Sequence, residues 1–165
     1  MPSAWAVSDR STIERQTRYG TVRGVDDSAA TGTYAWKGVP FAKPPTGALR
    51  WKAPQEPDRW TSPKQTRQFG NACVQYGRIY GPGANNRYDR TIGETLNQAL
   101  GSEDCLYLNI WRPSTNRGGL PVIVFVHGGS NVSGYTADPV YDGAALAKAA
   151  NAVVVTVNYR LGIFG

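Results

Sequence analysis

The sequence has little that would anchor it in a membrane or export it. No stretch of its 165 residues approaches the roughly 20 consecutive apolar residues that a membrane helix needs, so no membrane span is predicted. The first 16 residues, MPSAWAVSDRSTIERQ, lack the apolar core of a signal peptide, which leaves open whether one precedes them. We expect residues 1–165 to form one domain or part of a larger one, with a poorly ordered segment at residues 1–16.

Acidic residues are in the minority. Twelve Asp and Glu residues stand against 18 Lys and Arg residues, which gives a net charge of +6 and a pI near 9.5. That balance would suit a nucleic-acid or anionic surface, but the arginines stand singly among aromatic and turn residues. Neither a basic helix nor a nucleic-acid-binding motif is present in the sequence. We therefore expect no nucleic-acid partner.

Histidine and cysteine are also scarce. His127 is the only imidazole and hence the only candidate base, but the sequence suggests no nucleophile or orienting carboxylate beside it. It directly follows an apolar strand and precedes a glycine turn, so we expect it to hold that turn in place through hydrogen bonds. Cys73 and Cys105, the only cysteines, suit either one disulfide or two unrelated buried thiols.

The first two thirds of the chain predict strands joined by ordered loops. Residues 17–25 and 33–39 suit the strands of a hairpin, and residues 105–111 alternate as a half-buried strand does. The run VIVFV at residues 122–126 is apolar throughout. Such a run is typical of a strand covered on both faces in a parallel sheet.

The last third predicts a parallel crossover. A helix over residues 143–150, capped by Asp142 and ended at Asn151, leads into a second buried strand at residues 152–157. A β-α-β order of this kind joins parallel strands through a right-handed crossover. Because no covering helix follows the last strand, we expect the chain to be an incomplete part of an α/β domain.

Several stretches carry a resemblance to a known family. In chain order they are KGVPFAKPPTGALRWKAP, FGNACVQ, SEDCLYLNIWRP, VIVFVHGGS and VVVTVNYRLGIFG. Together they resemble the type B carboxylesterases, which include para-nitrobenzyl esterases and cholinesterases. The resemblance implies the N-terminal portion of an α/β-hydrolase fold, with an antiparallel start to its sheet followed by the parallel β-α-β unit.

The resemblance also implies an activity. Members of the family are serine hydrolases that cleave carboxylic esters through an acyl-serine intermediate, without a metal or an organic cofactor. Their nucleophile lies in a G-x-S-x-G motif, and no serine of this sequence stands in one. We therefore expect the nucleophile, acid and base in a C-terminal remainder of the same domain, and no activity from these 165 residues alone.

The glycine turn is the implied catalytic element of this chain. Similarity to the family assigns the oxyanion donors to the backbone N–H groups of Gly129 and Ser130, with Gly128 allowing the turn to form. Two residues depart from the family pattern. Ser130 stands where a third glycine or an alanine is usual, and Asn131 stands where an aromatic residue is common, which makes Asn131 a candidate wall of the substrate pocket.

The resemblance gives the cysteines a role. Family members carry a disulfide at the positions of Cys73 and Cys105, around an Ω-like loop at the mouth of the active-site gorge. Closing the loop would stabilise the fold by roughly 3–4 kcal/mol in the chain-entropy model. It would also imply a secreted or periplasmic protein. On this loop Tyr76 and Tyr80 either stack on substrate or pack the loop down.

Arg50 and Glu103 occupy positions that form an internal ion pair in the family, so we expect a paired, structural role for both.

A rival function remains, because neuroligin-like relatives use the fold as a non-catalytic adhesion module. The intact His127-Gly128-Gly129 favours the enzyme, since a binding module has little reason to keep an oxyanion loop. A G-x-S-x-G motif in the sequence that follows would discriminate between the two.

Overall fold

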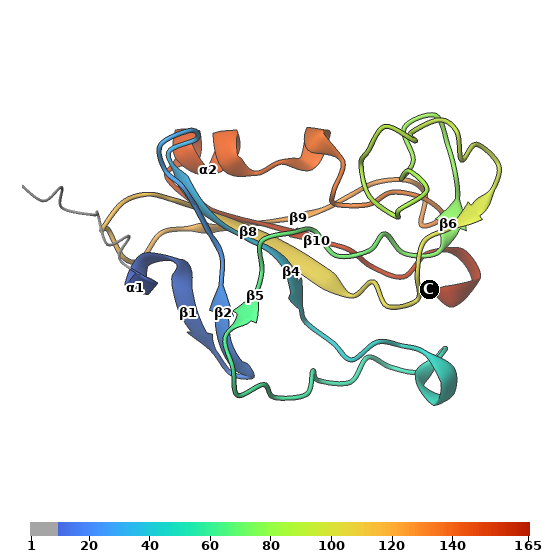
Figure 1. Ribbon diagram of the computed structural model, residues 1–165, viewed down its shortest axis with the longest axis horizontal. Helices are drawn as coiled ribbons and strands as arrows, with labels where there is room; N and C mark the ends of the chain where they lie inside the picture. The colour runs from blue at the N-terminus through green and yellow to red at the C-terminus, as the bar shows by residue number, and fades with distance from the viewer. Residues whose placement is uncertain (1–9) are drawn as a thin grey trace, which may run out of the picture.

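The structure, a computed structural model, describes residues 10–165. A central sheet in the order β3-β4-β8-β10-β9 is flanked by a three-stranded sheet, β1-β2-β5, and by a two-stranded ribbon, β6-β7 (Figure 1). The strands are β1 Glu14–Thr17, β2 Gly20–Arg23, β3 Val25–Asp27, β4 Thr33–Pro40, β5 Lys64–Gln65, β6 Gln75–Tyr76, β7 Ala99–Leu100, β8 Tyr107–Pro113, β9 Val122–Val126 and β10 Val153–Val157. The α-helices are α1 Arg10–Ile13 and α2 Ala144–Ala150.

The central sheet begins antiparallel and ends parallel. The pairs β3/β4, β4/β8 and β8/β10 are antiparallel, and β10/β9 is parallel, with α2 as the crossover. This confirms the predicted order of an antiparallel start and a β-α-β unit. Asn151 ends the helix as predicted, in the left-handed conformation. The start is corrected by one residue: Gly143 is the N-cap, and the Asp142 carboxylate accepts the Ala144 N–H at 2.9 Å from one position earlier.

Two apolar cores cover the two faces of this sheet. The face under α2 is filled by Ala35, Trp111, Ala144, Ala147 and Val154. The opposite face packs Trp36, Val39 and the partly buried Leu108 and Ile110 against Val22 of the small sheet. Strand β8 alternates between the two faces as predicted, with Trp111 toward the helix and Ile110 toward the small sheet. Both of its faces are covered, however, so it is not the half-buried strand that the sequence predicts.

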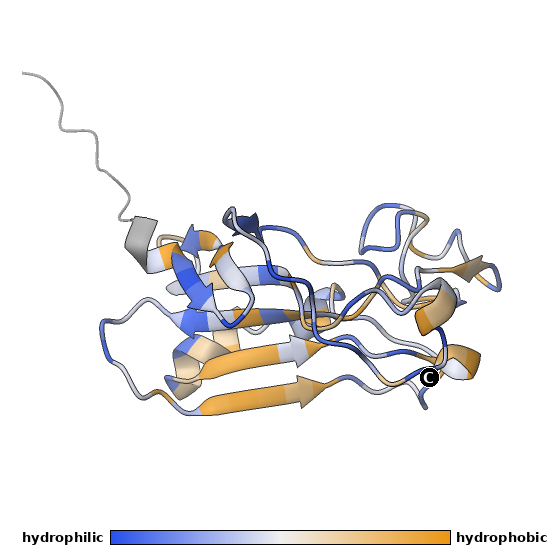
Figure 2. Ribbon diagram, turned by 90° about the horizontal axis from the view of Figure 1, so that it is seen from below, coloured by the Kyte–Doolittle hydropathy of each residue, from blue (hydrophilic) through white to orange (hydrophobic). Residues whose placement is uncertain are grey.

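Strand β9 differs from its prediction. It was expected to be covered on both faces, but it forms the edge of the central sheet, and Val122, Val124 and Val126 are each 61% exposed. Figure 2 shows it as the lowest strand, hydrophobic along its whole length. An apolar run indicates that a strand is suited to a covered position, but it does not show that the covering elements are present. Within the described residues β9 pairs with β10 alone.

The N-terminal boundary is also corrected. Residues 1–9 lie outside the described part, but α1 and β1 occupy positions within the segment predicted to be poorly ordered. Strand β1 pairs with β2, where Glu14 forms an ion pair with Arg23. The indole N–H of Trp36 donates to the Ile13 carbonyl at 2.8 Å. Pairing and this buried donor order the segment.

The predicted disulfide between Cys73 and Cys105 is present, with both residues buried beside Ala42, Leu106 and Leu161. It closes the loop that carries β6 and β7. In Figure 1 this yellow-green loop lies at the end of the sheet where β9 and β10 terminate. Neither α-helix of the described part has the length and apolar character of a membrane-spanning segment.

The predicted ion pair between Arg50 and Glu103 is bidentate, with Nε and Nη2 of Arg50 donating to the two carboxylate oxygens at 2.7 and 2.6 Å. It is less internal than expected, because the Arg50 side chain is 39% exposed. The hydrogen bond from Arg50 holds the pKa of Glu103 below its ordinary value of 4.5.

A double-mutant cycle with Arg50→Gln and Glu103→Gln should therefore show non-additive melting temperatures at pH 7. The double variant should lose less than the sum of the two single variants, because in the Glu103→Gln background Arg50→Gln removes only the contacts of Arg50 with the rings of Trp51 and Phe164. Since the folded pKa of Glu103 lies below the unfolded one, the coupling should shrink as pH falls below about 4.5. Additive losses at pH 7 would show that the two groups do not interact.

Candidate functional site

The candidate site is the loop that leaves the carboxyl end of β9. Val126 pairs with Val157 in the parallel register, so His127 and the segment after Val157 emerge side by side. In parallel α/β sheets, ligands bind at the carboxyl ends of the strands. The loop after β9, which holds the predicted oxyanion residues, is therefore taken as the candidate site.

Glycine is required at two positions of this loop. Gly129 has φ +122°, and a Cβ there would lie 1.9 Å from the Ser133 carbonyl oxygen. Gly134 has φ +119°, and a Cβ there would lie 2.3 Å from Nδ1 of His127. A Cβ at Gly128 would meet nothing within 4 Å, so the turn depends on Gly129 and not, as expected, on Gly128.

Two consecutive peptide units of the loop are held by their carbonyl oxygens. Nδ1 of His127 is 2.9 Å from the Gly128 oxygen, and the Gly129 oxygen accepts the N–H groups of Val132 and Ser133 at 3.1 and 3.2 Å. In a trans peptide the C=O and the following N–H point in opposite directions. Fixing these two carbonyls therefore fixes the directions of the Gly129 and Ser130 N–H groups.

The His127 side chain is buried beneath the loop that it supports. It is 2% exposed, and its ring stacks on Tyr159 with centroids 4.4 Å apart. Burial lowers the pKa of His127, so the neutral imidazole is favoured. The Gly128 carbonyl is an acceptor, which assigns the proton to Nδ1; within the described residues, buried Nε2 has no hydrogen-bond partner. This geometry agrees with the structural role predicted for His127.

The segment after β10 ties the loop down from one side. The hydroxyl of Tyr159 donates to the His127 oxygen at 2.7 Å, and Oδ1 of Asn158 accepts the Thr136 N–H at 2.9 Å. The N–H of Gly162 donates to the Asn131 oxygen at 2.7 Å. These contacts explain why a stretch as polar as NYR directly follows a buried strand.

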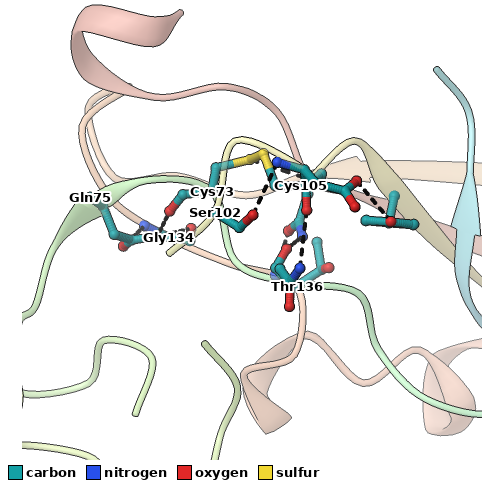
Figure 3. The surroundings of a disulfide bond; sticks show 10 residues. Cys73, Gln75, Ser102, Cys105, Gly134 and Thr136 are labelled. Atoms are coloured by element: carbon teal, nitrogen blue, oxygen red, sulfur yellow. Dashed lines mark hydrogen bonds between the residues drawn. A yellow bond between two sulfur atoms is a disulfide. The ribbon is translucent and has the colours of Figure 1, made fainter. Parts of the chain in front are cut away.

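Two buried amides complete the support, and the sequence analysis missed both. Nδ2 of Asn109, in β8, donates to the hydroxyls of Thr136 and Thr156 at 2.9 and 3.0 Å. Gln75 binds the loop at Gly134 from the disulfide-closed side (Figure 3). An asparagine on the helix-facing side of the alternating strand was a signal that could have revealed Asn109, because a buried amide needs partners.

A cavity of about 720 Å³ lies between the glycine turn and the disulfide-closed loop. Gly128 and Gly129 line it together with Tyr76 and Tyr80, which are 68% and 78% exposed and so do not pack their loop down. Asn131, the other candidate pocket residue, is exposed and does not line this cavity. Within the described residues, no group of three or more His, Cys, Asp or Glu side chains could hold a metal ion.

Comparisons with known proteins agree with the fold and with the motifs. The sequence profile of the carboxylesterase family matches residues 11–165. The chain is 40% identical over 149 residues to the para-nitrobenzyl esterase of Bacillus subtilis (strain 168), an alignment that covers 90% of the chain and 28% of that protein. It is 42% identical over 161 residues to the fumonisin B1 esterase of Sphingopyxis macrogoltabida, covering 97% of the chain and 26% of the relative.

The solved structure of a thermophilic PNB esterase superimposes with a TM-score of 0.77 at 39% identity, over 92% of this chain and 29% of that one. The fold is therefore part of the α/β-hydrolase fold of these esterases. The chain spans little more than a quarter of the length of the curated relatives it matches.

The burial of His127 has a consequence for stability. Because its folded pKa lies below the ordinary value of 6.5, the unfolded chain binds this proton more readily. Its contribution is thus complete above pH 6.5 and declines as pH falls below it, by at most about 1.4 kcal/mol per pH unit. The melting temperature of the parent should fall more than that of His127→Asn between pH 7 and 5.5. Parallel pH profiles would contradict the assignment of a buried neutral imidazole.

The departure at Ser130 should be measurable as strain. Ser130 and Asn131 both have left-handed φ values, 56° and 59°, and this conformation costs a non-glycine residue about 1–2 kcal/mol. Ser130→Gly should raise the free energy of unfolding by about 0.5–1 kcal/mol after the added entropy of the unfolded chain is counted. Ser62→Gly, at an exposed loop residue outside the left-handed region, should lower it. A loss of stability in Ser130→Gly would refute the strain.

Proposed function

The chain belongs to the carboxylesterase family, and we propose that the full-length protein hydrolyses carboxylic esters through an acyl-serine intermediate. The supporting observation is the pair of peptide units that carry the Gly129 and Ser130 N–H groups: hydrogen bonds hold their two carbonyls, and Gly128 and Gly129 line the cavity, whereas Ser130 does not. In this proposal their N–H groups stabilise the oxyanion of the reacting ester. Fixed dipoles aimed at a developing charge need no reorganisation during the reaction.

The chemistry requires a nucleophilic serine with its acid and base, and this sequence lacks the G-x-S-x-G motif that carries such a serine. A serine Oγ attacks the ester carbonyl carbon while its proton passes to a histidine base, and the carbonyl electron pair moves onto oxygen. Collapse of this intermediate expels the alcohol, which takes the proton, and water then releases the acid by the same steps. We place the serine, acid and base in a C-terminal remainder of the same domain, since no G-x-S-x-G occurs here. The 165-residue chain alone is expected to be inactive.

Two further observations support that assignment. The chain spans little more than a quarter of the length of its curated relatives. The apolar outer edge of β9, with three valines each 61% exposed, offers a further strand and its helices a place to pack. The remainder of the domain would occupy this edge, which restores the covered environment that the sequence of β9 predicts.

The protein is proposed to act in a secreted or periplasmic compartment, because the Cys73–Cys105 disulfide persists under oxidising conditions. The alternative, a non-catalytic adhesion module, is disfavoured by the supported peptide pair, which such a module does not need. Reaction of the full-length protein with p-nitrophenyl acetate discriminates between the two. Turnover of p-nitrophenyl acetate well above the uncatalysed rate supports the esterase, and hydrolysis at the uncatalysed rate supports the module.

Deleting the N–H of residue 129 tests the role of the loop. Proline is unsuitable because its φ near −65° is incompatible with +122°. Gly129→glycolic acid, introduced as a backbone ester, replaces the N–H by oxygen and keeps the conformational freedom of glycine. Acylation of the full-length enzyme should slow by about 10²–10³-fold, as for other lost oxyanion donors.

The same ester placed at Gly118, in an exposed loop, is the matched control and should leave acylation unchanged. A Gly129 variant that acylates at the parent rate would show that this N–H does not stabilise the oxyanion.

A further inference from the structure

The side-chain amide of Gln75 binds both the backbone N–H and the backbone C=O of Gly134 in the candidate oxyanion loop. Its Oε1 accepts the Gly134 N–H at 3.0 Å, and its Nε2 donates to the Gly134 oxygen at 3.0 Å (Figure 3). Nε2 also donates to the Cys73 oxygen at 3.0 Å, so this 5% exposed amide is well satisfied. We infer that Gln75 is a positioning residue of the esterase site, which orients the oxyanion N–H groups through Gly134.

Gln75 influences the Gly128–Gly129 peptide unit because Gly134 lies against the His127 ring and the Gly128 oxygen. A Cβ at Gly134 would lie 2.3 Å from Nδ1 of His127 and 2.7 Å from the Gly128 oxygen. The Gly134 backbone thus packs against the very hydrogen bond that directs the Gly129 N–H. A displacement of Gly134 by a fraction of an ångström changes the room available to that bond.

The contact reaches the second peptide unit through Ser133. Ser133 is bonded to Gly134, and its N–H donates to the Gly129 oxygen at 3.2 Å. That oxygen belongs to the peptide unit that presents the Ser130 N–H. Holding both polar atoms of Gly134 therefore stabilises the closing residue of the turn and, with it, both candidate donors.

Gln75 itself is fixed by the disulfide. Its Nε2 binds the carbonyl of Cys73, and Cys73 is covalently bonded to Cys105, two residues before β8 begins. The loop after β9 is in this way held on one side by the segment after β10 and on the other by Gln75. A glutamine amide is suited to the task because it supplies both an acceptor and two donors on a side chain long enough to span from β6.

The inference rests on the proposed ester hydrolysis and predicts a defect in reaction, not in binding. Gln75→Met keeps the length and volume of the side chain but leaves the Gly134 N–H and C=O without their partners. In the full-length enzyme the acylation rate constant should fall about 10- to 100-fold, the scale expected for misplaced reacting groups, while KM changes less than threefold. The affinity for a trifluoromethyl ketone, whose adduct carries the oxyanion, should fall by the same factor as kcat/KM.

Gln75→Glu provides a second readout that general destabilisation does not reproduce. An ionised carboxylate repels the carbonyl oxygens of Cys73 and Gly134, whereas the protonated acid can again donate to one of them while accepting the Gly134 N–H. The acylation rate of Gln75→Glu relative to the parent, measured at each pH, should therefore rise as pH falls from 8 to 5.5. The melting temperature of Gln75→Glu is measured at each pH as well, and over the range where the variant is fully folded a structural role alone predicts a constant ratio.

Two variants serve as controls. Thr33→Val removes a buried hydroxyl that is 2.7 Å from that of Thr31, at the opposite end of β4, and so lowers stability without touching the loop. Gln98→Met removes an exposed amide from the same disulfide-closed loop. Both should acylate at the parent rate.

The outcomes separate the two claims. A parent enzyme that forms no acyl intermediate refutes the proposed function, and the inference falls with it. If the parent acylates, then parent-like acylation in Gln75→Met, or a Gln75→Glu ratio that does not rise at low pH, refutes the role of Gln75. Should Gln75→Met fail to fold, the ratio measured for Gln75→Glu decides alone.

Discussion

The site depends on the orientation of two consecutive peptide units after strand β9. A planar peptide unit can rotate about the bonds to its two flanking Cα atoms, and a hydrogen bond to its carbonyl oxygen restrains that rotation. The His127 imidazole holds the first plane, and the N–H groups of Val132 and Ser133 hold the second. The other features of the loop follow: glycine at 129 and 134, a neutral buried imidazole, and buried amides on either side.

The sheet supplies the frame for this arrangement. Because β9 and β10 run parallel and in register, the residues after them leave the sheet together, and Tyr159 stacks on His127 and bonds its carbonyl. Strand β8, antiparallel to β10, brings the amide of Asn109 beneath Thr136. A buried hydrogen-bond network of this kind stabilises the fold when its polar groups have partners. The conformation of the loop therefore depends on β8, β9, β10 and the disulfide together.

Sequence patterns predicted the elements better than their surroundings. The alternation of β8 and the β-α-β unit were predicted from periodicity, because those patterns are local. The predicted environment of β9 was wrong, since an apolar run such as VIVFV does not say which elements cover it. The prediction of a poorly ordered N-terminal segment was wrong for residues 10–16, because the order of these residues depends on partners distant in sequence, such as Arg23 and Trp36.

For the site, the cysteine pair and the glycine turn came from family resemblance, whereas Gln75, Asn109 and Asn158 were not predicted. Gln75 and Asn158 bind backbone groups, which leave no trace in residue identity, and Asn109 binds two hydroxyls and a backbone N–H. These partners lie up to 87 positions away in sequence. The same limit explains Ser130: its identity was noted, but its strain follows from a φ of 56° that only the folded loop shows.

The most direct test of the central claim is a crystal structure of the full-length protein after reaction with a p-nitrophenyl phosphonate, whose adduct carries an oxygen where the oxyanion forms. The account predicts that this oxygen lies about 2.7–3.1 Å from the backbone nitrogens of both Gly129 and Ser130. It also predicts that the contact from His127 to the Gly128 oxygen is retained. A phosphonyl oxygen bound by other donors, with these two N–H groups directed elsewhere, would contradict the account.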